Sequence, residues 1–506
     1  MSIGPRGDPD GVHATLSERL ARHADRQGRI AALDDGRTTI TYDDLHRLVA
    51  GAARRLEAAG IVDGATVGLT VRDEIDHLIV ALALLDLGAA QVALASHAPA
   101  PVRAELARRC GVTHCVVDDP TDRVDAVATV LAGPLALGES EGRPTPGRAG
   151  AGDAPALILT GSGTTGRPKI VRYTQRDLAR QAGHPMIDPR GERLLHLASV
   201  ENNNAIRMRL YTLYGGGTCV LRNRSESTAH RLCATLRATW LELSVVHAAA
   251  LAQASRTEGR LPTQVRVRVG GSRVPASLRR AILERATSRL HVSYGATETA
   301  AIAIAAPSMH DVADCVGPPL AGVEVEILGD DGAPARPGEP GSIRLRADGM
   351  ARAYVDDDEA TRRHFRDGWF VPGDVGSWTA DGRLCVHGRL DDMMILNGIN
   401  IHPFEIERVL EDHPSVEAAA AFPLASAVHG QIPMAAVELR AGAEVSAAEL
   451  TAWSRERLGS RAPRRVLFVE SLPRNAAGKV LRRELAGAME GRVDAEAAVR
   501  RAAVSR

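Results

Sequence analysis

Residues 157–173 read Leu157-Ile-Leu-Thr-Gly-Ser-Gly-Thr-Thr-Gly-Arg-Pro-Lys-Ile-Val-Arg-Tyr173. The apolar run Leu157–Leu159 predicts one strand, and Lys169–Tyr173 predicts a second. The loop between them is rich in glycine and hydroxyl groups, and such a loop, with a lysine behind it, can surround the β- and γ-phosphates of a nucleotide. The stretch therefore predicts a strand–loop–strand unit that binds phosphate. Taken alone, the loop would also suit a solvent-exposed turn.

Two well-known phosphate-binding patterns fit this loop less well. The letters Gly161-Ser-Gly-Thr-Thr-Gly166 match the dinucleotide fingerprint, but that motif continues into a helix, whereas Pro168 and a strand follow here. A Walker loop needs lysine where Arg167 stands, and then a serine or threonine, which is missing. The sequence thus disfavours both a dinucleotide-dependent oxidoreductase and a kinase-like P-loop.

Lysine is used at only two positions, Lys169 and Lys479, although the chain contains 62 Lys and Arg residues. Arginine carries a wide planar fork, whereas lysine offers a compact ammonium on a flexible stem, which suits a cramped position against a phosphate or carboxylate oxygen. Lys479 ends the segment Pro473-Arg-Asn-Ala-Ala-Gly-Lys479, and Lys169 ends the glycine loop. We therefore expect both lysines to take part in the chemistry rather than to stand there by chance.

Composition excludes several classes of partner. Lys plus Arg equals Asp plus Glu at 62 each, so no overall field attracts nucleic acid or an anionic membrane. The most apolar stretch, Leu78–Leu94, is interrupted by Asp86 and Gly88 and is too short to span a bilayer. The cysteines form no CxxC pair, and the N-terminal residues have no apolar signal core. We expect a cytoplasmic protein whose cysteines are small core residues.

The order of elements predicts an α/β fold with two domains. A helix at 41–60, a strand at Ala65–Val71, a helix at Ile75–Leu87 and a strand at Gln91–Ala95 alternate as in a parallel sheet, whereas residues 132–154 resemble an exposed connector. From about 307 to 390, short strands separated by Asp-Gly and Pro-Gly turns predict a β-rich portion. We expect a large N-terminal domain of layered α/β sheets at residues 1–390 and a small, mobile C-terminal α+β domain at residues 391–506.

Four later segments, together with the glycine loop, resemble the adenylate-forming superfamily, which comprises acyl- and aryl-CoA synthetases, peptide-synthetase adenylation domains and luciferases. They are Tyr294-Gly-Ala-Thr-Glu-Thr299, Gly368-Trp-Phe-Val-Pro-Gly-Asp374, the run from Gly388 to Glu407, and Leu472-Pro-Arg-Asn-Ala-Ala-Gly-Lys479. Their order and spacing match the family from about Thr41 to Leu485. The resemblance implies ATP-dependent conversion of an acid to an acyl-adenylate with release of pyrophosphate, followed by transfer to a thiol or another nucleophile.

The resemblance also implies a role for particular residues. Lys479 matches the lysine that bridges the attacking carboxylate and the α-phosphate, Thr297 the hydroxyl that contacts that phosphate, and Glu298 the acid that organises Mg²⁺. In-line attack brings two anions together, so cations are required there. The residues that match ATP-binding positions are Thr160, Ser162, Gly163, Thr164, Thr165, Gly166, Lys169, Tyr294 on the adenine, Asp374 on the ribose hydroxyls, and Arg389. Asp391 matches the hinge about which the small domain turns.

The acid is expected to be small and polar, or aryl. Asn203 stands where amino-acid-activating relatives carry an aspartate for the substrate ammonium, so an α-amino acid is disfavoured. The neighbouring pocket positions are unusually polar for such a site, which disfavours a long fatty chain. The predicted pocket residues are Asn203, Glu201, Arg207, Gly271, Ser272 and Ser293, although some of these side chains could face away from the acid.

The sequence does not decide which nucleophile accepts the acyl group from the adenylate. Many CoA ligases carry Gly-Gly where this chain has Asn397-Gly398, near the channel for the pantetheine thiol, and the bulkier asparagine could narrow that channel. CoA, the phosphopantetheine of an acyl carrier protein and an amine all remain alternatives, as does adenylation of a small oxyacid such as nitrite. A catalytically silent adenylate-binding scaffold is disfavoured because such a protein would be expected to lack Lys479 or Glu298, and both are present.

Overall fold

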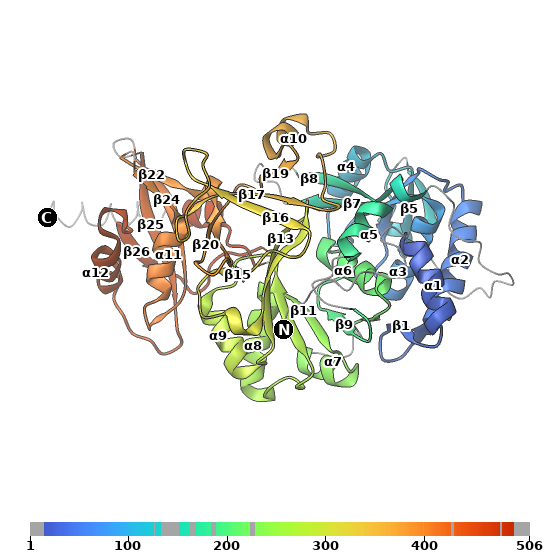
Figure 1. Ribbon diagram of the computed structural model, residues 1–506, viewed down its shortest axis with the longest axis horizontal. Helices are drawn as coiled ribbons and strands as arrows, with labels where there is room; N and C mark the ends of the chain where they lie inside the picture. Colours follow the sequence, from blue (N-terminus) through green and yellow to red (C-terminus); the bar gives the residue numbers. More distant parts are fainter. Residues whose placement is uncertain are drawn as a thin grey trace.

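The computed structural model describes residues 15–125, 127–132, 151–161, 168–183, 189–222, 228–397, 399–426, 430–475 and 478–489. Its elements form a large N-terminal domain and a small C-terminal domain, which lies at one end of the molecule beside α8 (Val245–Glu258) and α9 (Ala276–Arg285) (Figure 1). Within the described ranges, every helix is too short or too polar to cross a bilayer.

The glycine loop joins the last two strands of the first sheet. This sheet runs in the order β6 (Ala128–Leu131), β5 (His114–Val117), β3 (Thr66–Thr70), β4 (Ala90–Ala93), β7 (Pro155–Gly161) and β8 (Lys169–Thr174). The pairs from β6 to β7 are parallel, and β8 returns antiparallel to β7. The predicted strand–loop–strand unit is therefore confirmed on either side of the loop.

The second sheet carries most of the remaining N-terminal strands. Its order is β14 (Ala300–Ala305), β13 (Leu290–Ala296), β12 (Arg266–Gly270), β11 (Trp240–Ser244), β9 (Arg193–His196), β10 (Thr218–Val220), β1 (Ala31–Asp34) and β2 (Thr39–Thr41). All neighbours from β13 to β1 are parallel. The carboxyl ends of β9, β11, β12 and β13 therefore meet at one edge, which is where open parallel sheets bind ligands.

Helices between these two sheets form one continuous apolar core. They are α1 (Leu16–Gln27), α2 (Tyr42–Ala58), α3 (Glu74–Leu87), α5 (Gln175–Gly183) and α6 (Asn203–Tyr214). The predicted helix that begins at Thr41 is α2, with Thr41 and Asp44 forming a capping box, and it buries Leu45 and Leu56. The apolar run Leu78–Leu85 of α3 is buried on all sides, which explains why it contains no polar residue. The remaining N-terminal helices are α4 (Ala100–Cys110) and α7 (Ala229–Thr235).

The predicted β-rich portion is an antiparallel sheet. Its order is β15 (Cys315–Gly317), β21 (Leu384–Arg389), β20 (Asp374–Trp378), β17 (Gly341–Ala347), β19 (Trp369–Phe370) and β18 (Phe365–Arg366), with β16 (Val323–Leu328) paired to β17. Helix α10 (Asp358–His364) precedes β18. All six cysteines of the chain are buried free thiols, as the sequence predicts.

The C-terminal domain has apolar clusters of its own, made of residues between Met394 and Met489. Its strands are β22 (Met394–Leu396), β23 (Ile399–Ile401), β24 (Val416–Ser426), β25 (Gly430–Leu439) and β26 (Arg465–Phe468), with α11 (Pro403–Glu411) and α12 (Ala447–Leu458). The small α+β domain of the sequence analysis is thus confirmed, whereas its boundary at Asp391 stays a prediction. Asp391 itself lies in a short 3₁₀ turn, Leu390–Asp392.

The connection from the second sheet to the β-rich sheet depends on Gly317. Its φ is +85°, and a Cβ atom at this position would stand 2.0 Å from the carbonyl oxygen of Ile304 on β14. Gly382 has a similar φ of +78°, but a Cβ atom there would meet nothing within 4 Å. The two glycines share a left-handed backbone and differ only in crowding.

We expect Gly317→Ala to lower the free energy of unfolding by about 2–4 kcal/mol, because left-handed strain and a backbone overlap add together. Gly382→Ala should cost only about 1–2 kcal/mol, from the strain alone. Urea denaturation of both variants measures the difference. If both variants lost the same free energy of unfolding, β14 and β15 would be able to move apart at Gly317 without cost.

Candidate active site

The first site residues lie where β7 and β8 enter the glycine loop. The Nδ2 atom of Asn203, the first residue of α6, donates to the carbonyl oxygen of Thr160 over 2.5 Å. This bond fixes the start of α6 against the end of β7. The predicted phosphate-contacting residues Ser162, Gly163, Thr164, Thr165 and Gly166 lie outside the described residues.

Lys169, at the other end of the loop, is held by uncharged groups. Its Nζ atom donates to Nε2 of His364 over 2.8 Å and lies 4.9 Å from the ring centroid of Tyr354. The Nδ1 atom of His364 donates to the carbonyl oxygen of Val371 over 2.7 Å, so Nε2 is left as the acceptor. Burial lowers the pKa of both Lys169 and His364, which keeps the imidazole neutral.

The turn between β13 and β14 presents Thr297 and Glu298. Tyr354 donates its hydroxyl to Oε1 of Glu298 over 2.7 Å. The carbonyl oxygen of Thr297 accepts from the hydroxyl of Tyr173 over 2.5 Å and from Nη2 of Arg207 over 2.7 Å. Burial, followed by the charge of Glu298, raises the pKa of Tyr354, so its phenol remains a donor to the carboxylate.

Glu298 is the residue that suits a magnesium ion. The described residues contain no group of three His, Cys, Asp or Glu side chains able to enclose a metal. Mg²⁺ that is bound together with a nucleotide needs only one or two carboxylates, because phosphate oxygens and water complete its coordination. The single carboxylate of Glu298, which acts electrostatically on Lys169 at the end of the glycine loop, fits that requirement.

A second polar cluster joins β13 to the β-rich sheet. Tyr294 donates its hydroxyl to Oδ2 of Asp374 over 2.5 Å, and Nη1 of Arg389 donates to Oδ1 of Asp374 over 3.1 Å. Nη2 of Arg389 reaches Oδ2 of Asp391 over 3.3 Å. Each oxygen of Asp374 keeps acceptor capacity for further hydroxyl donors. Burial and then Asp374 raise the pKa of Tyr294, so its phenol stays protonated.

The side chains around Lys169, Glu298 and Arg389 influence one another electrostatically and form one cluster. The charges of Glu298 and Arg389 both act on the pKa of Lys169, and the same two charges act on Tyr354 and Tyr294. The structure thus brings together the ends of the glycine loop, the Thr297–Glu298 turn and the Asp374–Arg389 pair, which are more than 200 residues apart in the sequence at their extremes.

The predicted pocket residues lie beyond the carboxyl ends of β12 and β9 and on β13 itself. Gly271 has a φ of +87°, with open space where a Cβ atom would stand. The Oγ atom of Ser272 is buried without a hydrogen-bond partner. On β13, Ser293 lies so close to Gly270 that a Cβ atom added to Gly270 would stand 2.6 Å from the Ser293 hydroxyl. Asn203 and Arg207 lie one turn apart on α6.

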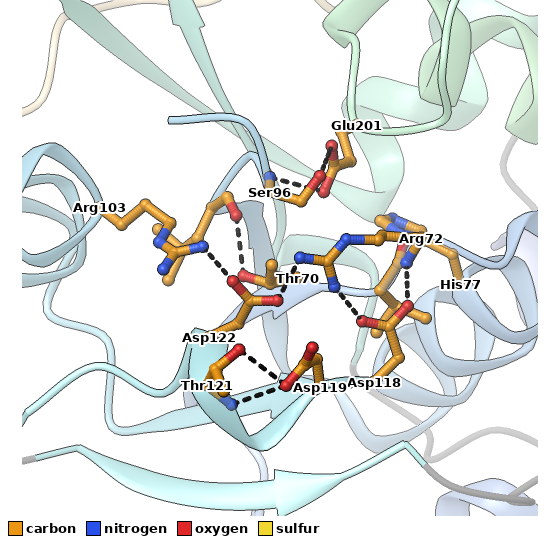
Figure 2. Close-up of polar contacts among 12 residues, drawn as sticks. Thr70, Arg72, His77, Ser96, Arg103, Asp118, Asp119, Thr121, Asp122 and Glu201 are labelled. Atoms are coloured by element: carbon orange, nitrogen blue, oxygen red, sulfur yellow. Dashed lines mark hydrogen bonds and ion pairs between the residues drawn. The ribbon is translucent and has the colours of Figure 1, made fainter. Parts of the chain in front are cut away.

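The carboxylate of Glu201 bonds to Ser96, and among the residues that the structure describes it bonds to no other predicted pocket residue. Its Oε1 atom accepts from the backbone N–H of Ser96 over 2.9 Å, and its Oε2 atom accepts from the Ser96 hydroxyl over 3.0 Å (Figure 2). Glu201 therefore connects the loop after β4 to the segment before α6. The sequence prediction that Glu201 contributes to the acid pocket gains no support from these contacts.

A separate ion-pair network lies below Glu201 in Figure 2. Arg72 pairs with Asp118 and Asp122 at the carboxyl ends of β3 and β5, and Arg103 also pairs with Asp122.

Lys479 lies on a loop that touches the N-terminal domain. Gly478, with a φ of +83°, packs so closely on α8 that a Cβ atom would stand 2.8 Å from Cβ of Val245. Val245 directly follows β11, so the loop lies at the same edge of the sheet as Gly271 and Ser293. The Lys479 side chain is exposed, and its backbone N–H is held by Oδ1 of Asn475 over 3.0 Å.

A cavity begins just after the Thr297–Glu298 turn, where Thr299, Ala300 and Ala301 line it. Leu194 and Trp240 line it from the amino ends of β9 and β11, opposite the edge that carries the candidate site, and Tyr211 lines it from the turn of α6 after Arg207. None of the predicted site residues lines this cavity.

Sequence reasoning missed Tyr354 and His364. Neither belongs to a segment that carries the resemblance, and a tyrosine or histidine beside an α-helix has no distinctive pattern. Tyr354 is one of only six tyrosines in the chain, which is the single signal that could have drawn attention to it.

Comparison with known families agrees with this geometry. The family model described as "AMP-binding enzyme" matches residues 20–355, and the model described as "AMP-binding enzyme C-terminal domain" matches residues 405–479. A 2-succinylbenzoate–CoA ligase from Geobacillus kaustophilus is 34% identical over 484 residues, which cover 90% of this chain and 94% of the relative. A feruloyl-CoA synthase from an Amycolatopsis species is 31% identical, covering 92% of this chain and 96% of the relative.

Solved structures are similar over nearly the whole length. The amide bond synthetase McbA from Marinactinospora thermotolerans has a TM-score of 0.84 at 28% identity, covering 94% of this chain and 99% of its own. The o-succinylbenzoate CoA synthetase of Bacillus subtilis, in complex with its acyl-adenylate, has a TM-score of 0.79 at 26% identity, covering 92% and 97%. The chain therefore belongs to the AMP-binding enzyme family and is an AMP-forming acid ligase.

Proposed function

We propose that this enzyme adenylates a small polar or aryl carboxylic acid with ATP and then transfers the acyl group to the thiol of CoA. The observation that carries the proposal is the single cluster formed by Lys169, Glu298, Tyr294, Asp374 and Arg389 around the ends of the glycine loop. Lys169 offers a cation for the phosphates, Glu298 a carboxylate for Mg²⁺, and Asp374 an acceptor for the ribose hydroxyls.

In the first step a carboxylate oxygen attacks the α-phosphorus of ATP, and the bond to pyrophosphate breaks. Among the described residues, the amine of Lys169 bonds to the His364 imidazole and to no carboxylate, so its charge is available to the phosphates. Asp374 accepts from the ribose hydroxyls, and Tyr294 lies against the base. Mg²⁺, held by Glu298 and the phosphates, would neutralise charge on the leaving pyrophosphate. Thr297 and the amine of Lys479 stabilise the charge that builds up around the α-phosphate.

The second step favours CoA over a carrier protein. The relatives with 34% and 31% identity are both named for CoA products. Asn397 has a φ of +49° in the turn between β22 and β23. Asparagine is among the residues that tolerate this left-handed conformation, so it replaces the usual glycine without disturbing the turn.

An amine acceptor is the second candidate. Two observations favour it: the Asn397 side chain, which adds bulk beside the predicted thiol channel, and the TM-score of 0.84 to an amide bond synthetase. Transfer to an amine would use the same acyl-adenylate and would release AMP, so the two candidates share the first step.

The direct test is incubation with ATP, Mg²⁺ and a panel of small acids, with pyrophosphate and AMP release measured with and without CoA. We expect pyrophosphate release that depends on the acid, and AMP release that CoA accelerates. Acceleration by an amine and not by CoA would replace the first candidate by the second. Absence of pyrophosphate release with every acid would overturn the proposed adenylation.

We expect Lys479→Ala to lower the rate of adenylation on the order of 10²–10³-fold while ATP binding is largely kept, because the amine acts on charge that develops only in the transition state. Acid-dependent pyrophosphate release and calorimetric titration with ATP measure the two effects. Arg457→Ala, at a partly exposed cation on α12 of the same domain, is the control and should behave as the parent. Parental turnover of Lys479→Ala would refute its role.

We expect Asp391→Pro to spare adenylation and to slow transfer, because a ring-fixed φ prevents the turn of the small domain. Pyrophosphate exchange reports the first step and CoA-dependent product formation the second. Asp391→Ala removes the contacts with Arg389 and Arg363 but leaves the backbone free, so it should affect transfer much less. Equal loss of both steps in Asp391→Pro would reject the hinge at this residue.

A further inference from the structure

The imidazole of His364, the last residue of α10, is held in one orientation. Its Nδ1 atom donates to the carbonyl oxygen of Val371 over 2.7 Å, and the backbone N–H of Val371 donates to the carbonyl oxygen of His364 over 2.7 Å. The ring meets that of Tyr354 edge to face, with centroids 5.9 Å apart. The side chain is buried, with 9% exposure. Because Nδ1 carries the proton, Nε2 is fixed as an acceptor.

This acceptor faces the amine of Lys169. Nζ and Nε2 are 2.8 Å apart. An ammonium group has three N–H donors, and His364 takes up one of them. The imidazole is neutral, so the bond fixes the place of the amine without compensating its charge. A lysine stem is flexible, and this contact therefore decides where the cation stands.

The opposite charge that acts most strongly on Lys169 is the carboxylate of Glu298, which raises the pKa of the amine against the effect of burial. No ion pair joins the two among the described residues. The carboxylate accepts from the hydroxyl of Tyr354 over 2.7 Å, and the amine lies 4.9 Å from the centroid of the same ring. Both groups thus meet at one phenol without bonding to each other.

Loss of the bond to His364 would free the amine to move toward Glu298. The resulting ion pair would satisfy the cation meant for the phosphates and the carboxylate meant for Mg²⁺ before a nucleotide arrived, and binding would have to break it. A neutral acceptor on the other side of the amine prevents this without competing for the charge.

We propose that His364 is a positioning residue for ATP: as a neutral acceptor it holds the Lys169 amine apart from Glu298 and in place for the β- and γ-phosphates. The inference rests on the proposed role of Lys169 and adds a residue that acts through it. AMP lacks both of these phosphates, so His364 should matter for the binding of ATP and not for that of AMP.

The test compares the affinities of each variant for ATP and for AMP, measured by calorimetric titration with Mg²⁺ and without any acid, so that no turnover occurs. We expect His364→Leu to weaken ATP binding about 10-fold to 100-fold, the range for loss of a hydrogen bond to a charged group, and to leave AMP binding nearly unchanged. His364→Gln keeps a neutral acceptor on a side chain of similar length, so it should bind both nucleotides nearly as the parent does.

His364→Glu tests whether the acceptor has to be neutral. A carboxylate would hold the amine at least as firmly but would neutralise it, so ATP binding should fall at least as far as in His364→Leu. If this variant bound ATP as well as His364→Gln does, the neutrality of the acceptor would be irrelevant and the proposal would be wrong on that point.

His310→Leu is the matched control. His310 also belongs to the N-terminal domain and donates from Nε2 to a backbone carbonyl oxygen, that of Leu290, over 3.0 Å. Leu290 begins β13, so this contact lies at the end of the strand opposite the site. The control should bind ATP and AMP as the parent does, and the melting temperature establishes that each variant is folded.

Two further results would overturn the inference. One is an equal loss of ATP and AMP affinity in His364→Leu, which would show that His364 only supports the fold. The other is parental ATP affinity in a folded His364→Leu variant. A parent enzyme that bound neither nucleotide, or that released no pyrophosphate with any acid of the panel above, would instead refute the proposed adenylation, and this outcome is seen without any variant.

Discussion

The site depends on charged groups whose nearest partners carry no opposite charge. The amine of Lys169 bonds to a neutral imidazole, the carboxylate of Glu298 to a phenol, and the guanidinium of Arg207 to a backbone carbonyl. Each partner fixes a geometry without neutralising the group it holds. An ion pair within the protein would have satisfied these charges before any ligand arrived, and binding would then have to break it. Neutral partners would leave the attraction of these groups available to the phosphate, metal and acid of the proposed reaction.

This arrangement contrasts with the rest of the molecule. Away from the site, several buried charges are paired directly, as in Arg268 with Glu242 and Arg103 with Asp122. The topology of the second sheet explains how the site is assembled. Parallel strands β9, β11, β12 and β13 deliver their following loops to one edge, so residues from distant parts of the chain meet there without needing ion pairs to bring them together. Among the described residues, Lys169 and Glu298 keep uncharged partners in the site, whereas Asp374 and Arg389 form an ion pair there.

Sequence reasoning could predict the elements and the family, because these depend on local patterns. The alternation around α2 and α3, the strand pair that flanks the glycine loop and the antiparallel portion after residue 307 all follow from periodicity and turn residues. Partners of the site residues could not be predicted in the same way. Tyr354 and His364 approach Glu298 and Lys169 only through tertiary packing, and the bond from Glu201 to Ser96 joins residues 105 positions apart. The pairing of buried charges could not be predicted either: the sequence does not show that Arg209 pairs with Glu74, 135 positions away.

Arg273 links the acid pocket to the small domain. It follows Gly271 and Ser272 in the chain, and its guanidinium joins Asp314 of the N-terminal domain over 2.7 Å and Glu411 of α11 over 3.0 Å. Ser277 adds a bond from its hydroxyl to the carbonyl oxygen of Glu417 over 3.1 Å. The proposed rotation of the small domain would separate Arg273 from Glu411, whereas Asp314 belongs to the N-terminal domain and would retain the guanidinium. If the small domain rotates as proposed, the loop that carries Gly271 and Ser272 would therefore change its electrostatic surroundings through the Arg273–Glu411 contact.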